Sequence, residues 1–286
     1  MVKIHQIYYL DSQRPFLDPA FIPYDNRENA RPQWAEYHVF QKEYAAGPCP
    51  DGEYVGYLSW KFGAKTRLSG RRFADFVADN PGADVYFVNP YPLHARLFKS
   101  VWEQGDFYHP GILRFSESII RRAGYAFDLA SLVNDDSSLL FCNYWVGNRP
   151  FWDRYMRFAS DVERVLLNEL TPEEQAFLHS TADLQRHTLS HIPFILERLF
   201  STLVLNAPDL KYRAYRYSAA DLRARYGPVR GTLFRLLPES PPAVRKLVRV
   251  PLVLKAHVTK PLRALRRRRL VRGRTESDSG RLSPPA

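Results

Sequence analysis

Polar side chains occur near the ends of several predicted strands, where they could bind a charged ligand. Asp11 follows the first apolar stretch, Trp60 and Lys61 end the second, Asn89 ends the third, and Asn143 lies in a fourth. Ligands of open α/β sheets bind outside the carboxyl ends of the strands, so we expect these residues to converge. A lysine at such an edge suits phosphate chemistry, because it can neutralise negative charge that develops in a transition state.

Three side chains are candidates for acid–base chemistry. Glu197 lies in a strongly apolar segment, where an unpaired charge would be costly, and a carboxylate there is a candidate general base. The alternative is an ion pair with Arg198 that fixes the helix. Asp106 and His109 lie in the predicted loop "EQGDFYHPGI". Asp106 is a second candidate base, and His109 either contacts a ligand or serves as a turn residue.

Metal-binding patterns are weak in this sequence. Asp135-Asp136 precede the fourth apolar stretch, and we interpret them as turn residues because they lie at its start, opposite the carboxyl ends where the other polar residues gather. His187 and His191 are spaced i, i+4, but the segment between them lacks the glutamate of an HExxH motif, and Pro193 predicts a helix start near His191. We therefore predict no metal-binding residues. P-loop, G-x-S-x-G and G-x-G-x-x-G motifs are also missing from the sequence, so kinase, hydrolase and dehydrogenase functions have no support.

Alternating strand and helix patterns predict the scaffold that positions these residues. Strands are predicted in "VKIHQIYYLD", "GEYVGYLSW", "ADVYFVNPYP" and "SLLFCNYWVGN" (138–148), with a long irregular loop after the first. Helices are predicted over 33–45, after a cap at Ser69, and after Arg149-Pro150. This order predicts an α/β fold, with a mainly parallel sheet layered by helices.

The pattern becomes helical after the fourth strand. Thr171, Pro172 and Glu174 form a capping-box signature at a helix start. Apolar residues at helical spacing in "HIPFILERLFSTLVL" predict a helix that packs on the sheet, and a further capped helix is predicted over 218–227.

The formal charge of +11 is concentrated near the C-terminus. Residues 241–274 contain twelve Lys or Arg and no acid, whereas residues 1–240 contain 28 basic and 28 acidic side chains. We predict an α/β domain over 1–206, a helical extension over 207–240 and a basic, partly disordered tail over 241–286.

The basic tail favours an anionic membrane surface as its partner, with a solvated disordered arm as the alternative. A nucleic-acid partner is the least favoured, because the tail lacks aromatic residues that could stack on bases. Two cysteines and the lack of an apolar leader segment predict a cytoplasmic protein. Since the sequence contains no apolar stretch near the roughly 20 residues that span a bilayer, we expect membrane contact to be peripheral, at the inner face.

Four segments occur in an order that resembles a group of bacterial polysaccharide-biosynthesis glycosyltransferases. Those proteins carry a strand of the type GLxHYRR, an NMF strand leading into FdxY, and later a helix containing ERL. The matching segments here are Gly56-Tyr57-Leu58-Ser59-Trp60-Lys61, Asn143-Tyr144-Trp145, Phe151 to Tyr155, and Glu197-Arg198-Leu199. The resemblance covers about residues 1–205. It departs at Ser59 to Phe62, where one basic position is kept and the histidine is lost.

This resemblance implies a nucleotide-diphospho-sugar transferase fold, in which the first strand and its loop receive the nucleotide. The residues expected at the donor are Asp11, Lys61, Trp60, Asn89, Asn143 and Arg198, and those expected in catalysis are Glu197, Asp106 and His109. Lys61, helped by Arg67 or Arg198, would neutralise the departing diphosphate without a metal. A divalent cation (Mn or Mg) is the alternative cofactor.

We therefore predict a glycosyltransferase of the hexosyltransferase class. It would transfer a sugar from a nucleotide-diphospho-sugar donor to a cell-surface or capsular glycan acceptor, free or lipid-linked. The alternative is a noncatalytic interaction protein within a polysaccharide assembly complex, and a nucleic-acid binder acting through its tail is the third class.

Overall fold

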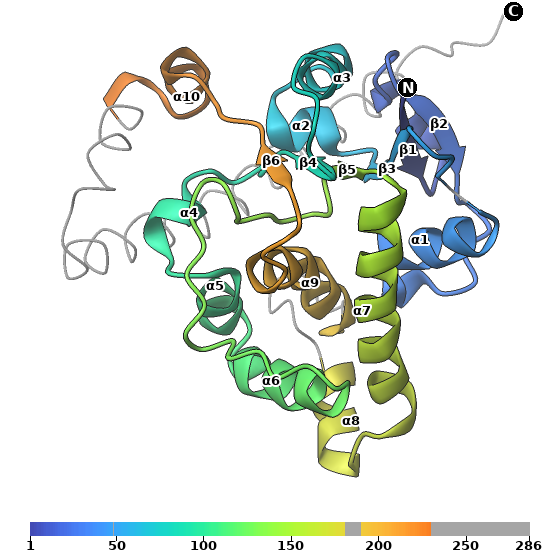
Figure 1. Cartoon of the computed structure of the whole chain (residues 1–286), viewed down its shortest axis with the longest axis vertical. Coiled ribbons are helices and arrows are strands. Elements are labelled where there is room, and N and C mark those ends of the chain that lie inside the picture. Colours follow the sequence, from blue (N-terminus) through green and yellow to red (C-terminus); the bar gives the residue numbers. More distant parts are fainter. Residues whose placement is uncertain (48, 181–189, 230–286) are drawn as a thin grey trace, which may run out of the picture. The chain divides into compact units, whose positions relative to one another are not determined.

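A six-stranded sheet forms the centre of the protein (Figure 1). The computed structural model describes residues 1–47, 49–180 and 190–229, all within the compact unit Met1–Phe234. The spatial order of the strands is β2-β1-β3-β5-β4-β6. Their bounds are β1 (Val2–Tyr8), β2 (Ile22–Asp25), β3 (Tyr54–Ser59), β4 (Val85–Phe87), β5 (Trp145–Gly147) and β6 (Tyr212–Ala214).

The direction of β5 distinguishes the sheet from a fully parallel one. β1 pairs in parallel with both β2 and β3, and β4 pairs in parallel with β6. β5 lies between β3 and β4 and is antiparallel to both. The prediction of an α/β fold with a mainly parallel sheet is confirmed, and one reversed strand at its centre is added to it.

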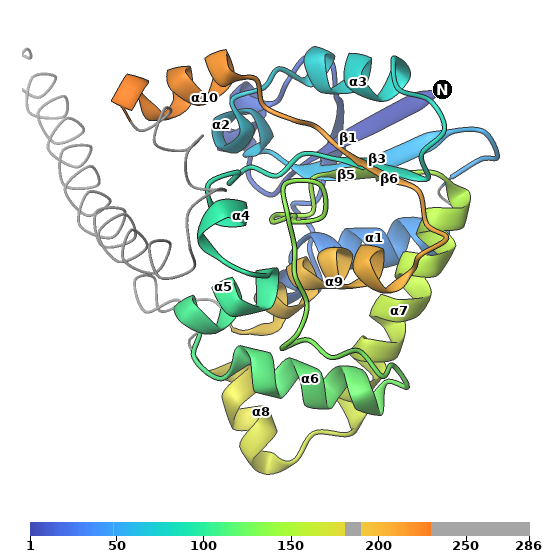
Figure 2. The ribbon, with the colours of Figure 1, turned by 60° about the vertical axis from the view of Figure 1, so that its left-hand side comes forward.

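Helices cover both faces of the sheet (Figure 2). On one face lie α2 (Phe62–Thr66), α3 (Gly70–Ala78) and α10 (Ala219–Tyr226). The other face carries α1 (Glu36–Ala45), α7 (Arg149–Asn168) and α9 (Ile192–Asn206). Beyond these lie α5 (Val101–Tyr108), α6 (Ile112–Arg122) and α8 (Pro172–His179). The remaining short helices are α4 (His94–Leu97) and the 3-10 turns η1 (Asp11–Phe16) and η2 (Pro32–Trp34).

Aromatic packing around Trp145 joins the sheet to the helices beneath it. The fully buried Trp145 ring on β5 lies 4.6 Å from Trp152 of α7, 5.1 Å from Phe40 of α1 and 6.4 Å from Phe200 of α9, measured between centroids. Edge-on and offset aromatic pairs at such distances stabilise beyond the area that they bury. One strand residue therefore fixes three helices relative to the sheet.

The helix starts agree well with the capping signals in the sequence. Ser69 caps α3, and Asn148 caps α7 just before Arg149-Pro150. Thr171 and Glu174 form the predicted capping box of α8, and Ser218 caps α10. These side chains satisfy backbone N–H groups that lack partners within the helix.

Several irregular regions are more structured than the sequence predicts. The expected long loop after β1 contains η1 and the edge strand β2. The expected loop around residues 103–112 is mostly helix α5, which ends at Tyr108, followed by the start of α6. In contrast, the predicted strand over 138–148 shortens to β5, because Cys142 and Asn143 adopt left-handed backbone conformations that no strand can include.

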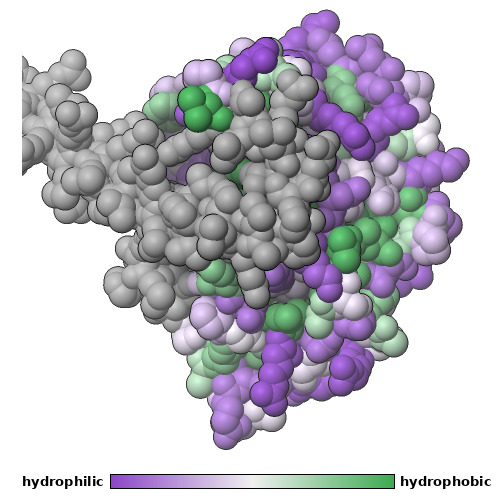
Figure 3. Space-filling view, turned by 90° about the vertical axis from the view of Figure 1, so that its left-hand side faces the viewer, coloured by the Kyte–Doolittle hydropathy of each residue, from purple (hydrophilic) through white to green (hydrophobic). Residues whose placement is uncertain are grey.

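The C-terminal regions extend beyond the described residues. The segment expected to be a helical extension over 207–240 contributes β6 at the sheet edge and then α10, and its residues 230–240 lie outside the described part. The predicted basic tail, 241–286, also lies outside it. Among the described residues, no helix is long and apolar enough to cross a bilayer. On the face in Figure 3, described hydrophobic residues form small groups between hydrophilic ones.

The close approach of β5 to Gly56 of β3 gives a test of the sheet. A Cβ atom at Gly56 would lie 2.4 Å from the carbonyl oxygen of Trp145 and 3.1 Å from Cγ2 of Val146. We predict that Gly56→Ala destabilises the protein by about 1–3 kcal/mol, since an overpacked backbone contact cannot relax locally. Urea denaturation monitored by circular dichroism measures the effect.

Gly63→Ala is the matched control. A Cβ at Gly63, on α2, would meet nothing closer than the Leu68 carbonyl oxygen at 3.7 Å. We expect this variant to be neutral or slightly stabilising, as alanine favours helix over glycine by roughly 0.5–1 kcal/mol. Equal stabilities for the two variants would contradict the close packing of β3 against β5.

Candidate functional site

The reversed direction of β5 brings a new segment to the carboxyl edge of the sheet. The ends of β1 and β3 point to this edge, and the start of antiparallel β5 meets them there. α2 begins immediately after β3, and the first residue of α1 also lies at this edge. We name the resulting group the edge cluster: Glu36, Lys61, Lys65, Cys142, Asn143, Tyr144 and Glu197.

Left-handed backbone is concentrated around the edge cluster. In the described residues, the non-glycine positions with positive φ are Ala35 (50°), Arg67 (63°), Cys142 (69°) and Asn143 (51°). Ala35 immediately precedes Glu36, and Arg67 follows α2. Left-handed backbone costs an L-residue roughly 1–2 kcal/mol, and such strain collects where function requires a particular geometry.

Lys65 is the central cation of the edge cluster. Its Nζ donates to Sγ of Cys142 at 3.0 Å and lies 5.9 Å from the Tyr144 ring centroid. Burial disfavours the ammonium, but interactions with Cys142, Tyr144 and Glu197 outweigh it and raise the pKa of Lys65 well above its usual range. Burial also raises the pKa of the Cys142 thiol to about 12. At neutral pH the pair is thus an ammonium and an uncharged thiol.

Tyr144 and Ser59 fix the wall of the site behind Lys65. The Tyr144 hydroxyl and the Ser59 hydroxyl are hydrogen-bonded at 3.0 Å, and both residues are buried. Gln6 on β1 donates through Nε2 to the carbonyl oxygens of Ser59 and Trp60, at 3.4 and 3.3 Å. These bonds tie the end of β3 to β1 and to the segment before β5.

Two glutamates lie within electrostatic range of the lysines. Burial raises the pKa of the Glu36 carboxyl, and the negative charge of Glu197 raises it further. Lys65 and Lys61 oppose this shift. A carboxyl group with a raised pKa beside a second carboxylate is the electrostatic arrangement of a general base or acid that works near neutral pH.

Asn143 presents an unsatisfied acceptor in the same region. Its side chain is 3% exposed, and its Oδ1 has no hydrogen-bond donor among the described residues. Buried polar atoms almost always have partners, so an unpaired amide oxygen on strained backbone points to a ligand or water at this position.

Several residues expected at the site serve the scaffold in the structure. The Asp106 carboxylate accepts from the backbone N–H of Gly111 at 2.9 Å, in the turn between α5 and α6. His109 ends α5 and packs its ring 4.1 Å from that of Phe194. Asp106 lies within helix α5, so the prediction of a loop for this segment is wrong.

Arg198 and Asp11 are also held in other networks. Arg198 is buried, and its guanidinium donates to the carbonyl of Val101 at 2.9 Å and to Oε1 of Gln104 at 2.6 Å, which joins α9 to α5. Burial lowers its pKa to about 10. The alternative ion pair with Glu197 is not among these bonds. Asp11, on η1, pairs with Arg27 at 2.9 Å.

Trp60 and Asn89 lie at the expected strand ends. The Trp60 ring stands 6.0 Å from that of Phe16, and Nζ of Lys61 lies 5.1 Å from the Trp60 ring centroid. Asn89 follows β4, and its Oδ1 accepts from the backbone N–H of Tyr91 at 2.9 Å. Trp60 thus adjoins the edge cluster through Lys61, whereas Asn89 lines a separate pocket.

The structure also places the residues weighed as metal ligands. Asp135 accepts from the hydroxyls of Ser137 and Ser138, as its predicted turn role requires. Asp136 pairs with Arg96 at 2.6 Å beside Asn89, so its expected distance from the carboxyl edge is wrong. The described residues contain no group of three or more His, Cys, Asp or Glu able to hold a metal ion. His187 lies outside the described part.

Sequence reasoning missed Glu36, Lys65, Cys142 and Tyr144. Glu36 occupied the polar side of a predicted helix start, where an exposed position is the default. Lys65 follows the predicted strand "GEYVGYLSW", in a segment for which α2 was not predicted. The single available signal was the pair "CN" within an apolar run, since asparagine tolerates left-handed backbone and interrupts a strand.

Comparisons with known proteins give limited similarity. A scan against protein-family models found no match, and a search of curated proteins also found none. Among solved structures, the chain is similar to the apo structure of the bifunctional glycosyltransferase WbbM, with 13% identity and a TM-score of 0.47. The match covers 75% of this chain and 44% of the WbbM chain, so this chain spans less than half the length of that protein.

The electrostatics of Glu36 can be tested directly. Glu197→Gln removes a negative charge and should lower the pKa of Glu36, whereas Lys65→Met removes a positive charge and should raise it further. Carboxyl carbon NMR across a pH titration, with Glu36→Gln used to assign the resonance, measures both shifts. An unchanged Glu36 pKa in both variants would show that these groups do not form one cluster.

Proposed function

We propose that the protein is a glycosyltransferase that uses a nucleotide-diphospho-sugar donor and transfers the sugar to a glycan acceptor. The observation that carries this proposal is the edge cluster: Glu36 interacts electrostatically with Lys61 and Lys65, Glu197 does so with Lys65, and the unpaired amide oxygen of Asn143 follows Cys142, which bonds Lys65. Open α/β sheets bind their ligands at this edge. The sequence resemblance to polysaccharide-biosynthesis glycosyltransferases supports the same function.

The lysines would receive the diphosphate. A departing nucleoside diphosphate carries negative charge, and fixed cations stabilise it most where water is excluded. Lys65 is held in place by Cys142 at 3.0 Å, and Lys61 precedes it by one helical turn. Cations one turn apart on a helix project to the same side, so both can contact one diphosphate group.

Glu36 would act as the base on the acceptor hydroxyl. Proton removal is most effective when the base has a pKa near the working pH, and both burial and Glu197 raise the pKa of Glu36 toward that range. In this arrangement Glu197 tunes Glu36, rather than acting as the base that the sequence predicts. Asn143 would donate to or accept from a sugar hydroxyl through its amide.

The residues present do not fit a divalent cation held by the protein alone. Metal ions of the Mg type take oxygen ligands, and the two glutamates of the edge cluster have ammonium groups beside them instead of further carboxylates. We therefore propose a metal-independent transferase. The noncatalytic alternative keeps the donor site and lacks turnover.

Ligand binding tests the proposal. A ligand that binds only the folded state raises its stability, by about 2.7 kcal/mol when its concentration is 100 times Kd. We expect uridine, guanosine, cytidine or thymidine diphosphate, or one of their sugars, to raise the melting temperature equally in EDTA and in manganese. Thermal-shift measurements on the full chain detect this.

Lysine variants localise the binding. Lys65→Met and Lys61→Ala should each weaken the nucleotide-induced shift, because each removes a charge from the diphosphate site. Lys211→Ala removes an exposed lysine at the start of β6 and should leave the shift unchanged. A shift that requires manganese, or one that survives both cluster variants, would contradict the lysine-based site.

A further inference from the structure

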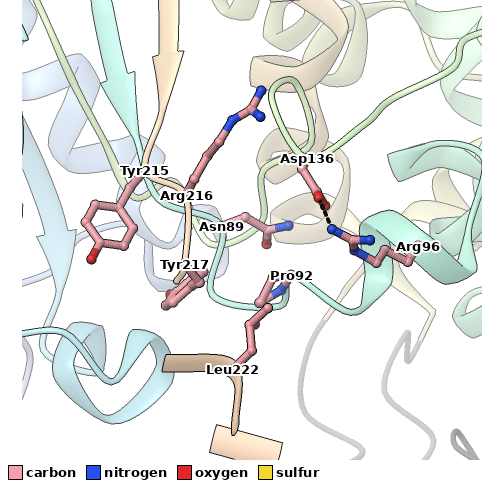
Figure 4. A pocket seen from close by; sticks show the side chains of 8 residues that line it. All are labelled: Asn89, Pro92, Arg96, Asp136, Tyr215, Arg216, Tyr217 and Leu222. Atoms are coloured by element: carbon pink, nitrogen blue, oxygen red, sulfur yellow. Dashed lines mark hydrogen bonds and ion pairs between the residues drawn. The ribbon is translucent and has the colours of Figure 1, made fainter. Parts of the chain in front are cut away.

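A pocket lies at the same sheet edge, beside the edge cluster. It is formed after the ends of β4 and β6 and is closed by α4, α10 and the loop that contains Asp136 (Figure 4). Its volume is about 160 Å³. Pockets that hold drug-sized ligands measure about 300–1,000 Å³, so this one suits a single small ring rather than a whole nucleotide sugar.

The lining combines the aromatic side chain of Tyr217 with planar polar groups, whereas the Tyr215 ring points away from Asn89 in Figure 4 and packs 5.3 Å from the Phe76 ring. The rings of Tyr215 and Tyr217 stand 5.5 Å apart at 79°, and the Asn89 amide lies at the centre of the lining in Figure 4. Aromatic rings offer an apolar face to the C–H groups of a sugar, while amide and guanidinium groups bind its hydroxyls. Such a lining suits a single saccharide ring.

The charges of the pocket favour an anionic ligand. Arg96 and Asp136 pair at 2.6 Å and balance each other, which leaves the charge of Arg216. Arg216 is exposed, makes no hydrogen bond or ion pair with other described residues, and extends on the opposite side of the pocket from Leu222 (Figure 4). A guanidinium binds a carboxylate through two parallel hydrogen bonds.

Hydrogen bonds from the Arg225 side chain connect this pocket to α2 of the edge cluster. Arg225 of α10 donates to the carbonyl of Pro90 in the pocket loop and to the carbonyls of Lys65 and Thr66, at 2.6 and 2.9 Å for the latter two. Tyr91 lies two residues after Asn89, and the charges of Lys65 and Glu197 both influence the pKa of its hydroxyl. A ligand in the pocket would therefore lie next to the proposed transfer site.

We infer that the pocket binds one acidic monosaccharide unit of the acceptor glycan, a pyranose with a carboxylate that pairs with Arg216. The assignment of this saccharide to the acceptor rests on the proposed function. The binding site itself rests on the cavity and its lining.

Saturation-transfer NMR titration of the full chain tests this inference, with methyl glucuronoside, methyl glucoside and inorganic phosphate as probes. We expect the glucuronoside to bind about fivefold to tenfold more tightly than the glucoside, as one charge-assisted pair contributes about 1 kcal/mol at a partly exposed site. Phosphate at equal concentration should not displace it. Equal binding of both glycosides, or full displacement by phosphate, would overturn the inference.

Variants of two nearby arginines provide the control. Arg216→Ala should reduce glucuronoside affinity to that of the glucoside, and Arg216→Lys should keep part of the preference. Arg213→Ala removes an exposed arginine of β6 whose guanidinium bonds Oδ1 of Asn80, outside the lining, and should change nothing. Glucuronoside affinity that is unaffected by Arg216→Ala would exclude the assigned pairing.

The two proposals fail in different ways. Nucleoside diphosphates that raise the melting temperature while the glucuronoside does not bind would overturn the pocket inference and support the transferase. Arg216-dependent glucuronoside binding without any nucleotide shift would support a saccharide pocket and overturn the transferase.

Discussion

The reversed strand β5 is the constraint on which the proposed site depends. Because β5 runs against β3 and β4, the segment that leads into it arrives at the edge where the other strands end. A parallel strand would have delivered Cys142, Asn143 and Tyr144 to the opposite edge. Trp145, the first residue of β5, anchors this geometry by packing against α1, α7 and α9. The packing of the core and the placement of polar groups are thus set by the same residue.

Within the edge cluster, repulsion between the two carboxylates is offset by the two lysines. Glu36 and Glu197 repel each other, and Lys61 and Lys65 offset that repulsion. The folded state raises the pKa of Glu36. Ionisation of this carboxyl therefore lowers the stability of the folded protein once the pH exceeds the pKa that Glu36 has in the unfolded chain. Charge held at such a cost, next to left-handed backbone, is typical of sites where activity opposes stability.

The sequence predicts the fold better than it predicts the site, for physical reasons. Helix caps such as Ser69 and Thr171 bond to groups only a few residues away, so a short stretch of sequence is enough to predict them. The direction of β5 depends on contacts with β3 and β4 that no local pattern contains. Local strand patterns were enough to predict that Trp60 and Asn89 lie at strand ends. They could not predict Glu36 and Lys65 as site residues, because only tertiary packing brings these two together. Arg198 shows the converse, because a charge in an apolar helix can satisfy backbone carbonyls instead of a ligand.

Donor turnover in EDTA by the wild-type protein and by Glu36→Gln is the decisive measurement for metal-independent transfer with Glu36 as the base. The nucleoside diphosphate released from a panel of nucleotide sugars, with a glycan acceptor present, is the quantity to measure. We expect release without metal by the wild type and its loss, by at least about 100-fold, in Glu36→Gln, since general base catalysis contributes roughly 10²–10⁴-fold. Glu36→Gln should melt no lower than the wild type at neutral pH, because it removes a charge that the fold disfavours. Undiminished release by a folded Glu36→Gln variant would exclude Glu36 as the base.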